Sequence, residues 1–233
     1  MFEDAVKFPL ESEDRVSTLI IGGVLTLLSV LIIPAFIVQG YLIRVLRAAA
    51  TGEEAAPSFT DWGDLFVDGL KLLVINFVYG IAIMVPFVLV VVVIGGGAAF
   101  AESSGGVAAL GVVTLLLFAL VTVVALVISY VIPAALTNFA LEGSLSAAFD
   151  VDTIKQVALT SDYFVGVLLG VVLGGVIGTI ASPLVFLLVG IPLLFYGQVV
   201  TYYCFGRGFA DARSGAGAGA AGGPVADAQR DAY

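Results

Sequence analysis

Histidine is absent from this 233-residue sequence, and cysteine and methionine are scarce, with one and two copies. Zinc, haem and iron–sulfur sites take most of their ligands from these side chains, and a disulfide needs two cysteines. Their scarcity excludes most metal, redox and thiol-pair chemistry. We therefore expect no cofactor.

Charge is also scarce. Only 12% of the residues are charged, whereas 61% are hydrophobic, and the mean hydropathy is +1.15. Soluble domains carry about 25% charged residues and about 45–50% apolar ones. A chain of this composition cannot cover itself with polar surface, so it is an integral membrane protein rather than a soluble enzyme.

Basic residues are the rarer of the two charge types. Nine bases face eighteen acids, which gives a net charge of −9. No basic patch is available to neutralise phosphates, so binding to nucleic acid is excluded. Acidic, lysine-poor chains are typical of salt-rich cytoplasm, where carboxylates hold water and salt screens their repulsion. The composition predicts an archaeal, halophilic origin; an acidic protein from an ordinary cell is the alternative.

The hydrophobic segments predict an all-α fold, a polytopic transmembrane helical bundle with about five spans and amphipathic interfacial helices. A bilayer core needs about 20 apolar residues in helical form. The run from 164 to 206 is too long for one crossing and is expected to turn at Ser182-Pro183. We expect one membrane domain over 1–211 and a disordered Gly/Ala-rich tail over 212–233. The predicted spans lie near 16–45, 70–95, 107–141, 164–181 and 184–205.

The distribution of Lys and Arg predicts the orientation in the cell membrane. Bases follow the first, third and fifth spans, whereas the turns after the second and fourth have none. The positive-inside rule then places the long loops and the C-terminal tail in the cytoplasm. Five crossings would leave Lys7 and Arg15 outside. If the 16–45 segment instead dips into the membrane and returns near Pro34, all nine bases lie inside, so the side of the N-terminus stays open.

A weak internal repeat is visible. Three acidic segments, 2–16, 58–71 and 144–163, each precede an apolar run. Three Ile-Pro pairs lie in the apolar segments that close these units, at Ile33-Pro34, Ile132-Pro133 and Ile191-Pro192. Repeats built from a surface helix and a helical hairpin would produce this order, and chance is the competing explanation.

Glycines recur at every fourth residue in the fourth span, at Gly166, Gly170, Gly174 and Gly178. Successive members advance by only about 40° around a helix, so all four line one face. Such a face lets a second helix approach closely. We predict a helix-packing surface within the chain, with a dimer or a pore lining as the alternative.

Residues 58–71 are patterned as an amphipathic helix, with acids on one side and aromatic residues on the other. Phe59, Trp62 and Phe66 are expected at headgroup depth, as the interfacial face of a helix on the cytoplasmic leaflet. Asp61, Asp64 and Asp68 lie on the opposite face. Their spacing resembles the first aspartate-rich motif of intramembrane prenyltransferases, which would make them ligands for Mg²⁺. A second such motif is missing, since only Asp150, Asp152 and Asp162 remain available, so a metal site is the lesser alternative.

Three segments resemble a family of archaeal multi-pass membrane proteins, the domain-of-unknown-function family numbered four thousand and thirteen. They are Gly-Tyr-Leu-Ile-Arg-Val-Leu-Arg at 40–47, Asp-Trp-Gly-Asp-Leu-Phe-Val-Asp-Gly-Leu-Lys at 61–71, and Ile-Pro-Ala-Ala-Leu-Thr-Asn-Phe-Ala at 132–140. The Asp-Trp-Gly-Asp block is the most specific, and the likeness covers 1–211. The resemblance implies a membrane protein, often haloarchaeal, and it carries no assigned activity.

The sequence thus predicts a non-enzymatic membrane component that packs helices or binds partners in the lipid bilayer, as a homo-oligomer or with other membrane proteins. A transporter or channel subunit for a neutral or amphipathic solute is the alternative, and a Mg-dependent lipid or isoprenoid enzyme is the lesser one. Convergence of the span amides on one cavity would favour transport, and paired aspartate clusters would favour the enzyme. These amides are Gln39, Asn76, Asn138 and Gln198.

Overall fold

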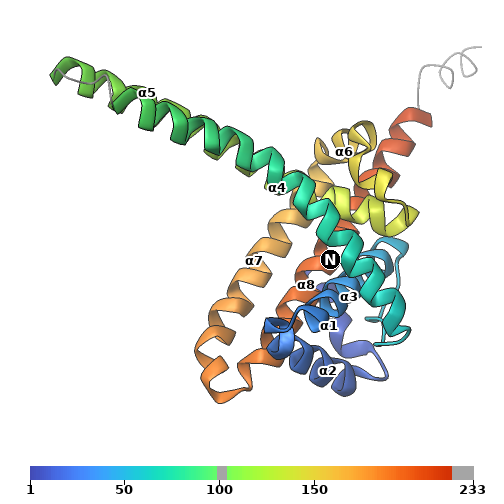
Figure 1. The fold of residues 1–233 in the computed structure, drawn as a ribbon. Helices are drawn as coiled ribbons and strands as arrows, with labels where there is room; N and C mark the ends of the chain where they lie inside the picture. The colour runs from blue at the N-terminus through green and yellow to red at the C-terminus, as the bar shows by residue number, and fades with distance from the viewer. Residues whose placement is uncertain (99–103, 222–233) are drawn as a thin grey trace, which may run out of the picture. The chain divides into compact units, whose positions relative to one another are not determined.

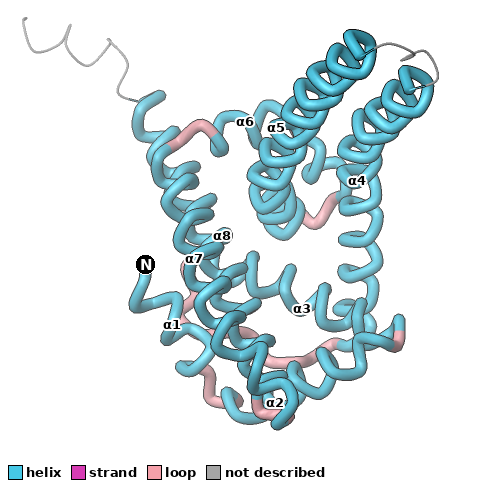
Figure 2. Tube along the Cα trace, turned by 90° about the vertical axis from the view of Figure 1, so that its left-hand side faces the viewer, coloured by secondary structure: helices cyan, strands magenta, loops and turns pink. Residues whose placement is uncertain are grey.

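The computed structural model describes residues 1–98 and 104–221 and confirms an all-α membrane fold (Figure 2). The described part contains eight α-helices and three short 3₁₀ helices. The α-helices are α1 (Phe2–Glu11), α2 (Arg15–Leu27), α3 (Ile32–Thr51), α4 (Trp62–Ala98), α5 (Ser104–Glu142), α6 (Val151–Ala158), α7 (Ser161–Leu184) and α8 (Gly190–Ala221). The 3₁₀ helices are η1 (Leu28–Val30), η2 (Leu145–Phe149) and η3 (Val185–Leu187).

The chain divides into two compact units. The first, which we call the body, comprises Met1–Leu72 and Pro133–Tyr233, described as far as residue 221. The second, which we call the long hairpin, is Leu73–Ile132.

Helix α8 forms the centre of the body. Helices α1, α2, α3, α6 and α7 all pack against it, and α7 lies beside it along much of its length (Figure 1). Its core side chains are almost completely buried, with Phe195, Val200 and Cys204 at 0% exposure. Helix α1 covers the middle of α8, where the Phe8 ring lies 4.5 Å from that of Tyr203. The Tyr196 hydroxyl donates to the backbone carbonyl of Val6 at 2.6 Å.

Three pairs of helices follow one another along the chain, α2–α3, α4–α5 and α7–α8. The first and last pairs follow the short helices α1 and α6, as the repeat predicted. Each Ile-Pro pair lies on the second helix of its hairpin. The middle unit differs, because the amphipathic helix predicted over 58–71 does not exist as a separate element. Residues 58–61 are non-helical, and Trp62 begins the 37-residue helix α4.

The first predicted span, 16–45, is not one helix. It is broken at residues 28–31 into α2, with 13 residues, and α3, with 20. Four helical segments are long and apolar enough to cross a bilayer: Ile32–Thr51, Trp62–Gly97, Gly105–Glu142 and Ser161–Leu187. The spans predicted near 70–95 and 107–141 correspond to α4 and α5. The structure therefore keeps the predicted order of apolar segments and changes the first into a helical hairpin.

The turn expected at Ser182-Pro183 lies a few residues later. Helix α7 continues through Pro183 to Leu184, and the chain reverses over residues 185–189. Leu188 adopts a left-handed backbone, with φ of 60°, and Gly190 follows. A Cβ on Gly190 would overlap the carbonyl oxygen of Ala181, so this tight reversal requires glycine at 190. Helix α8 then runs on to Ala221, into the segment expected to be disordered; the tail prediction for 222–233 lies outside the described residues.

The long hairpin consists of the apolar ends of α4 and α5. The Leu110 side chain lies against Gly97, and residues 80–87 share a groove with residues 121–129, so the two helices run antiparallel. Most of its large side chains are exposed, including Met84 at 62% and Leu116 at 64%. The predicted polar turn at 101–106 lies largely outside the described residues.

Candidate helix-packing site

The glycine face of α7 packs against α8, as predicted. A Cβ on Gly166 would lie 2.6 Å from the Cα of Gly208 and 2.9 Å from the carbonyl oxygen of Cys204. One on Gly170 would lie 2.8 Å from the Phe205 ring, and one on Gly174 would overlap the Thr201 hydroxyl. Real Cβ atoms do not approach other heavy atoms this closely, so the two backbones meet because these positions lack side chains.

Gly178 does not take part in this contact. A Cβ at Gly178 would have no neighbouring atom within 4 Å, and the same holds for Gly175. Gly178 instead borders a cavity of about 240 Å³ between α7 and α8, lined also by Gly174, Leu194, Gly197, Gln198, Thr201 and Tyr202. The close packing therefore ends one turn before the predicted face does.

Glycines on α8 complete the packing, and the sequence analysis missed them. Gly208 meets Gly166 backbone to backbone. On another side of α8, a Cβ on Gly206 would lie 2.7 Å from the carbonyl oxygen of Leu46 and 2.8 Å from the Ala49 side chain, both on α3. Isolated glycines inside an apolar helix were the available signal, since glycine destabilises a helix unless close packing requires it.

A second close crossing joins α3 to the first turns of α4. A Cβ on Gly40 would overlap the carbonyl oxygen of Leu65, and a Cβ on Gly69 would overlap that of Phe36. Gly40 and Phe36 are four residues apart, as are Gly69 and Leu65, so each helix presents one turn to the other. The Phe36 and Phe66 rings meet edge to face beside this crossing, 5.6 Å apart.

The three predicted interfacial aromatics occupy different environments. Phe59 is 9% exposed and stacks on Tyr41 with ring centroids 4.1 Å apart, so it belongs to the core. Phe66 is half-buried against Phe36, and Trp62 is 45% exposed. Only Trp62 keeps the exposure expected at an interface. Phe59 departs from the prediction because residues 58–61 are non-helical and turn it inward.

The three aspartates of the candidate Mg²⁺ motif do not assemble. Among the described residues, no three His, Cys, Asp or Glu side chains gather closely enough to hold a metal ion. Asp61 precedes α4 with a φ of 51°, and its carbonyl accepts the N–H of Asp64 at 2.9 Å. Asp68 pairs with Lys71 at 3.1 Å, and the Lys71 ammonium lies 5.9 Å from the Phe139 ring centre. Asp61 thus belongs to the turn that begins α4, and Asp68 belongs to a local ion pair.

The span amides do not converge on one cavity. Asn138 is buried and donates to the carbonyl of Ala147 at 2.9 Å. Gln198 borders the cavity beside Gly178, whereas Asn76 is exposed and Gln39 is half-buried. None of the other three amides lines the Gln198 cavity. The arrangement lacks the convergence that would favour a solute path through the described residues.

Hydrogen bonds tie the remaining parts of the body together. The Arg47 guanidinium on α3 donates to the carbonyl of Ala140 near the end of α5, at 2.5 Å. The Tyr163 hydroxyl accepts the N–H of Ala134 at 2.9 Å, immediately after Pro133. At the start of α6, Asp150 accepts the backbone N–H and the hydroxyl of Thr153. These two bonds lower the pKa of the Asp150 carboxyl.

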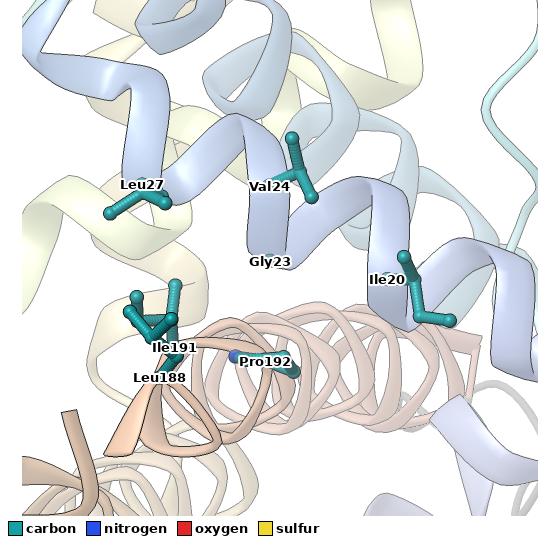
Figure 3. Close-up of a pocket in the computed structure, with 7 residues that line it drawn as sticks. All are labelled: Ile20, Gly23, Val24, Leu27, Leu188, Ile191 and Pro192. Atoms are coloured by element: carbon teal, nitrogen blue, oxygen red, sulfur yellow. The ribbon is translucent and has the colours of Figure 1, made fainter. Parts of the chain in front are cut away.

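An apolar groove of about 220 Å³ lies between α2 and the start of α8 (Figure 3). Ile20, Gly23, Val24 and Leu27 face it from α2, and Leu188, Ile191 and Pro192 face it from the reversal and the first turn of α8. A Cβ on Gly23 would lie 2.9 Å from the Pro192 ring. The groove therefore joins the turn of the α2–α3 hairpin to the turn of the α7–α8 hairpin.

Comparison with curated proteins and with solved structures gave no match. A family model described as "Protein of unknown function (DUF4013)" matches residues 27–190. The matched range runs from the end of α2 to the start of α8. It includes the whole α3–α4 crossing and the α7 side of the α7–α8 crossing. An all-α body packed through glycines, together with this match over more than half of the sequence, shows that the chain belongs to the DUF4013 family.

Proposed function

We propose that this protein is a non-enzymatic membrane component whose long hairpin binds a transmembrane helix of a partner protein. The observation that carries the proposal is the contrast in coverage between helices. The most apolar windows of α4 and α5 are each 6% buried, whereas that of α3 is 50% buried. The window of α7 is intermediate at 22%, so the long hairpin presents the two least covered of these candidate spans to the bilayer.

A groove on the long hairpin fits a helix as its occupant. It measures about 540 Å³ and is lined by Gly80, Ile83, Met84, Phe87, Val121, Thr122, Ala125, Leu126 and Ser129. Thr122, Ala125 and Ser129 are spaced at i, i+3 and i+7 and therefore share one face of α5. Small side chains allow close backbone approach, and hydroxyls can bond across helices in a membrane. A lipid chain uses neither property.

The distribution of polar groups supports this function over the two alternatives. Transport would be favoured by amides around a shared cavity, and in the body neither Gln39 nor Asn138 lines the cavity that Gln198 borders. A Mg-dependent lipid enzyme would be favoured by aspartates facing one another, and Asp68 is instead paired with Lys71. Close helix packing, in contrast, occurs at three places among the described residues: between α7 and α8, between α3 and α8, and between α3 and α4.

Photocrosslinking in native membranes tests the proposal. A benzophenone amino acid replaces Met84, which lines the groove, or Leu116, which is equally exposed and lies outside it. We expect a discrete protein adduct from position 84 and lipid adducts from position 116. Lipid adducts alone at both positions would rule out a helix partner. An adduct of twice the chain's mass would identify the partner as a second copy.

We also propose that the protein resides in the cell membrane. Each of the two body hairpins, α2–α3 and α7–α8, has one end flanked by Lys and Arg, and this end faces the cytoplasm. All nine bases then lie on the cytoplasmic side, as the positive-inside rule requires. An impermeant maleimide added to intact cells should label a cysteine at Ser103 and leave one at Ser146 unlabelled. Equal labelling of both positions would contradict this orientation.

A halophilic, archaeal setting is the final part of the proposal. The excess of nine acids supports it, because carboxylates remain hydrated in concentrated salt. The detergent-solubilised protein should melt earlier as KCl falls from molar to about 0.1 M, where screening weakens. A melting temperature that stays constant or rises on dilution would contradict this origin.

A further inference from the structure

The reversals of the two body hairpins are apolar and uncovered. At the α2–α3 reversal, Val30 is 87% exposed and Ile32 is 73% exposed. At the α7–α8 reversal, Phe186 is 91% exposed and Val189 is 67% exposed. The groove of Figure 3 is lined by Leu27 and Leu188, one from each hairpin, so the two reversals lie side by side at one end of the body. We call them together the apolar tips, residues 28–33 and 185–189.

Charged residues flank the hairpins and are absent from them. The sequence has none between Arg15 and Arg44, and none between Asp162 and Arg207. At the level where α1 covers α8, Asp4, Glu11, Glu53, Glu54 and Arg207 line one polar cavity of about 430 Å³. Loops that emerge into water on the far side of a membrane normally carry polar side chains. In both body hairpins the charged residues lie at one end, and the reversal at the other end is apolar.

The lengths of the arms set the depth of insertion. Helix α2 has 13 residues and is therefore about 20 Å long at 1.5 Å per residue. The part of α3 that precedes Arg44 spans about 18 Å by the same rise. The hydrocarbon core is about 30 Å thick. If the first tip reached water on the far side, Arg15 and Arg44 would lie about 10 Å inside the hydrocarbon, where charge is costly.

The α7–α8 hairpin reaches the same depth because its tip lies beside the first one. Helix α7, with 24 residues, has the length to cross a bilayer, but its tip and that of α2–α3 share one groove. Passage into water would also expose Phe186, Leu187, Leu188 and Val189 together.

The backbone at the tips is suited to an apolar phase. The Leu31 N–H donates to the carbonyl of Leu28 at 2.8 Å, and the Leu188 N–H donates to that of Val185 at 2.9 Å. The Ser29 hydroxyl donates to the carbonyl of Leu25 at 2.8 Å, which gives the one polar side chain of the first tip an internal partner. Internal bonds of this kind are what a chain reversal needs where water is absent.

From these observations we infer that both body hairpins are re-entrant. They enter the bilayer from one side, their apolar tips end in the lipid hydrocarbon, and both return to the side of entry. The partner of this surface is the acyl or isoprenoid chain of the membrane lipid. The N-terminus and residues 207–221 then lie on one side, and only the long hairpin crosses. This inference concerns the body and does not depend on what binds the long hairpin.

Spin-label accessibility in liposomes tests the inference. Cysteines replace Val30 or Phe186 in a Cys204→Ala background, with Glu53→Cys as the water control and Leu116→Cys as the lipid control. Dissolved oxygen partitions into hydrocarbon, whereas a polar nickel complex stays in water. At positions 30 and 186 we expect oxygen collisions to exceed nickel collisions severalfold, as at position 116 and opposite to position 53.

Two results would overturn the inference. Nickel accessibility at 30 or 186 equal to that at 53 would mean that the tips emerge into water. Low accessibility to both reagents would mean that protein, and not lipid, covers the tips. All four positions are on the surface, so their substitution leaves the packing of the body in place, and a melt of each labelled protein checks this.

Discussion

The long hairpin is built from more apolar helices than the body, with mean hydropathies of 2.9 and 3.0 against 1.5 for α3, yet the core lies in the body. Side chains such as Tyr41, Leu42 and Phe195 are fully buried in the body. In the long hairpin, a Cβ on Gly111 would meet no atom within 4 Å, and most large side chains are exposed.

The comparison shows what apolarity does and does not achieve in a membrane. Lipid chains are as apolar as leucine, so burying a side chain against another helix gains little hydrophobic free energy. The body packs because it also has glycines at its crossings, stacked aromatic rings and hydrogen bonds such as that from Tyr41 to the carbonyl of Pro57. In the long hairpin, most of the large apolar side chains stay exposed instead.

The largest effect is expected from leucine at the glycine crossings of the body. In Gly40→Leu the new side chain would collide with the backbone of Leu65, which cannot move aside as a side chain could. Overpacking usually lowers the free energy of unfolding by about 1–3 kcal/mol, and we expect a larger decrease here. It should be seen as early melting or as absence of the protein from the membrane.

Gly111→Leu in the long hairpin is the matched control and should melt like the parent. The same contrast is available within α7, where Gly166→Leu should be damaging and Gly178→Leu tolerated, because a Cβ at 178 meets no atom within 4 Å. Equal effects at 40 and 111 would mean that the two regions do not differ in packing.

A smaller effect is expected when leucine is shortened. Leu42 is 1% exposed, and Leu116 is 64% exposed. Leu→Ala in packed cores costs about 2–5 kcal/mol. We expect Leu42→Ala to fall near the lower end, because the removed methyl groups contact lipid rather than water after unfolding. Leu116→Ala should leave the melting temperature nearly unchanged, and a matching loss there would show that the long hairpin is already covered in the detergent-purified protein.

The smallest effect concerns charge, which distinguishes the two regions in sequence as well. The long hairpin has one acid in its sequence, Glu102. The other acids belong to the body, and one of them is Asp150 at the start of α6. Because Thr153 holds the pKa of Asp150 below its ordinary value, this carboxylate stabilises the fold above the unfolded pKa and loses that effect as pH falls through the folded one.

Asp150→Asn should therefore melt slightly earlier than the parent at pH 7, and the difference should shrink as the pH falls below the ordinary pKa of the carboxyl. Melts of both proteins across this range measure the difference. A difference that grows as the pH falls would have the wrong sign for this mechanism.

The order of the apolar segments was predictable, and the position of the breaks was not. Pro34 suggested where the first segment turns, but the break falls before it, at residues 28–31. Proline fits the first turn of a helix, where its missing N–H has no partner to lose, so α3 begins just upstream of Pro34. At the second reversal the chain passes Pro183 and turns where Gly190 permits contact with Ala181.

The packing site was predictable only where it was periodic. Four glycines at a spacing of four identified the face of α7, and three of them make the contact. Gly40, Gly69 and Gly206 have no such period, since each serves a crossing one turn long. The burial of Phe59 required knowledge of the tertiary structure, because helical periodicity is no guide where residues 58–61 are not helical.

Helix α8 leaves the ribosome after the other described helices, and the body is assembled around it. The contact between Ala49 and Gly206 joins positions separated by roughly 150 residues. At synthesis rates of about 5–20 residues per second, α3 waits about 8–30 s in the membrane before its partner exists. During that interval Leu46 and Ala49 lack the neighbour that Gly206 later provides, whereas Gly40 and Tyr41 can already meet Leu65 and Phe59. The first hairpin therefore has to be retained near the site of insertion, by the insertion machinery or by lipid, until α8 has been made.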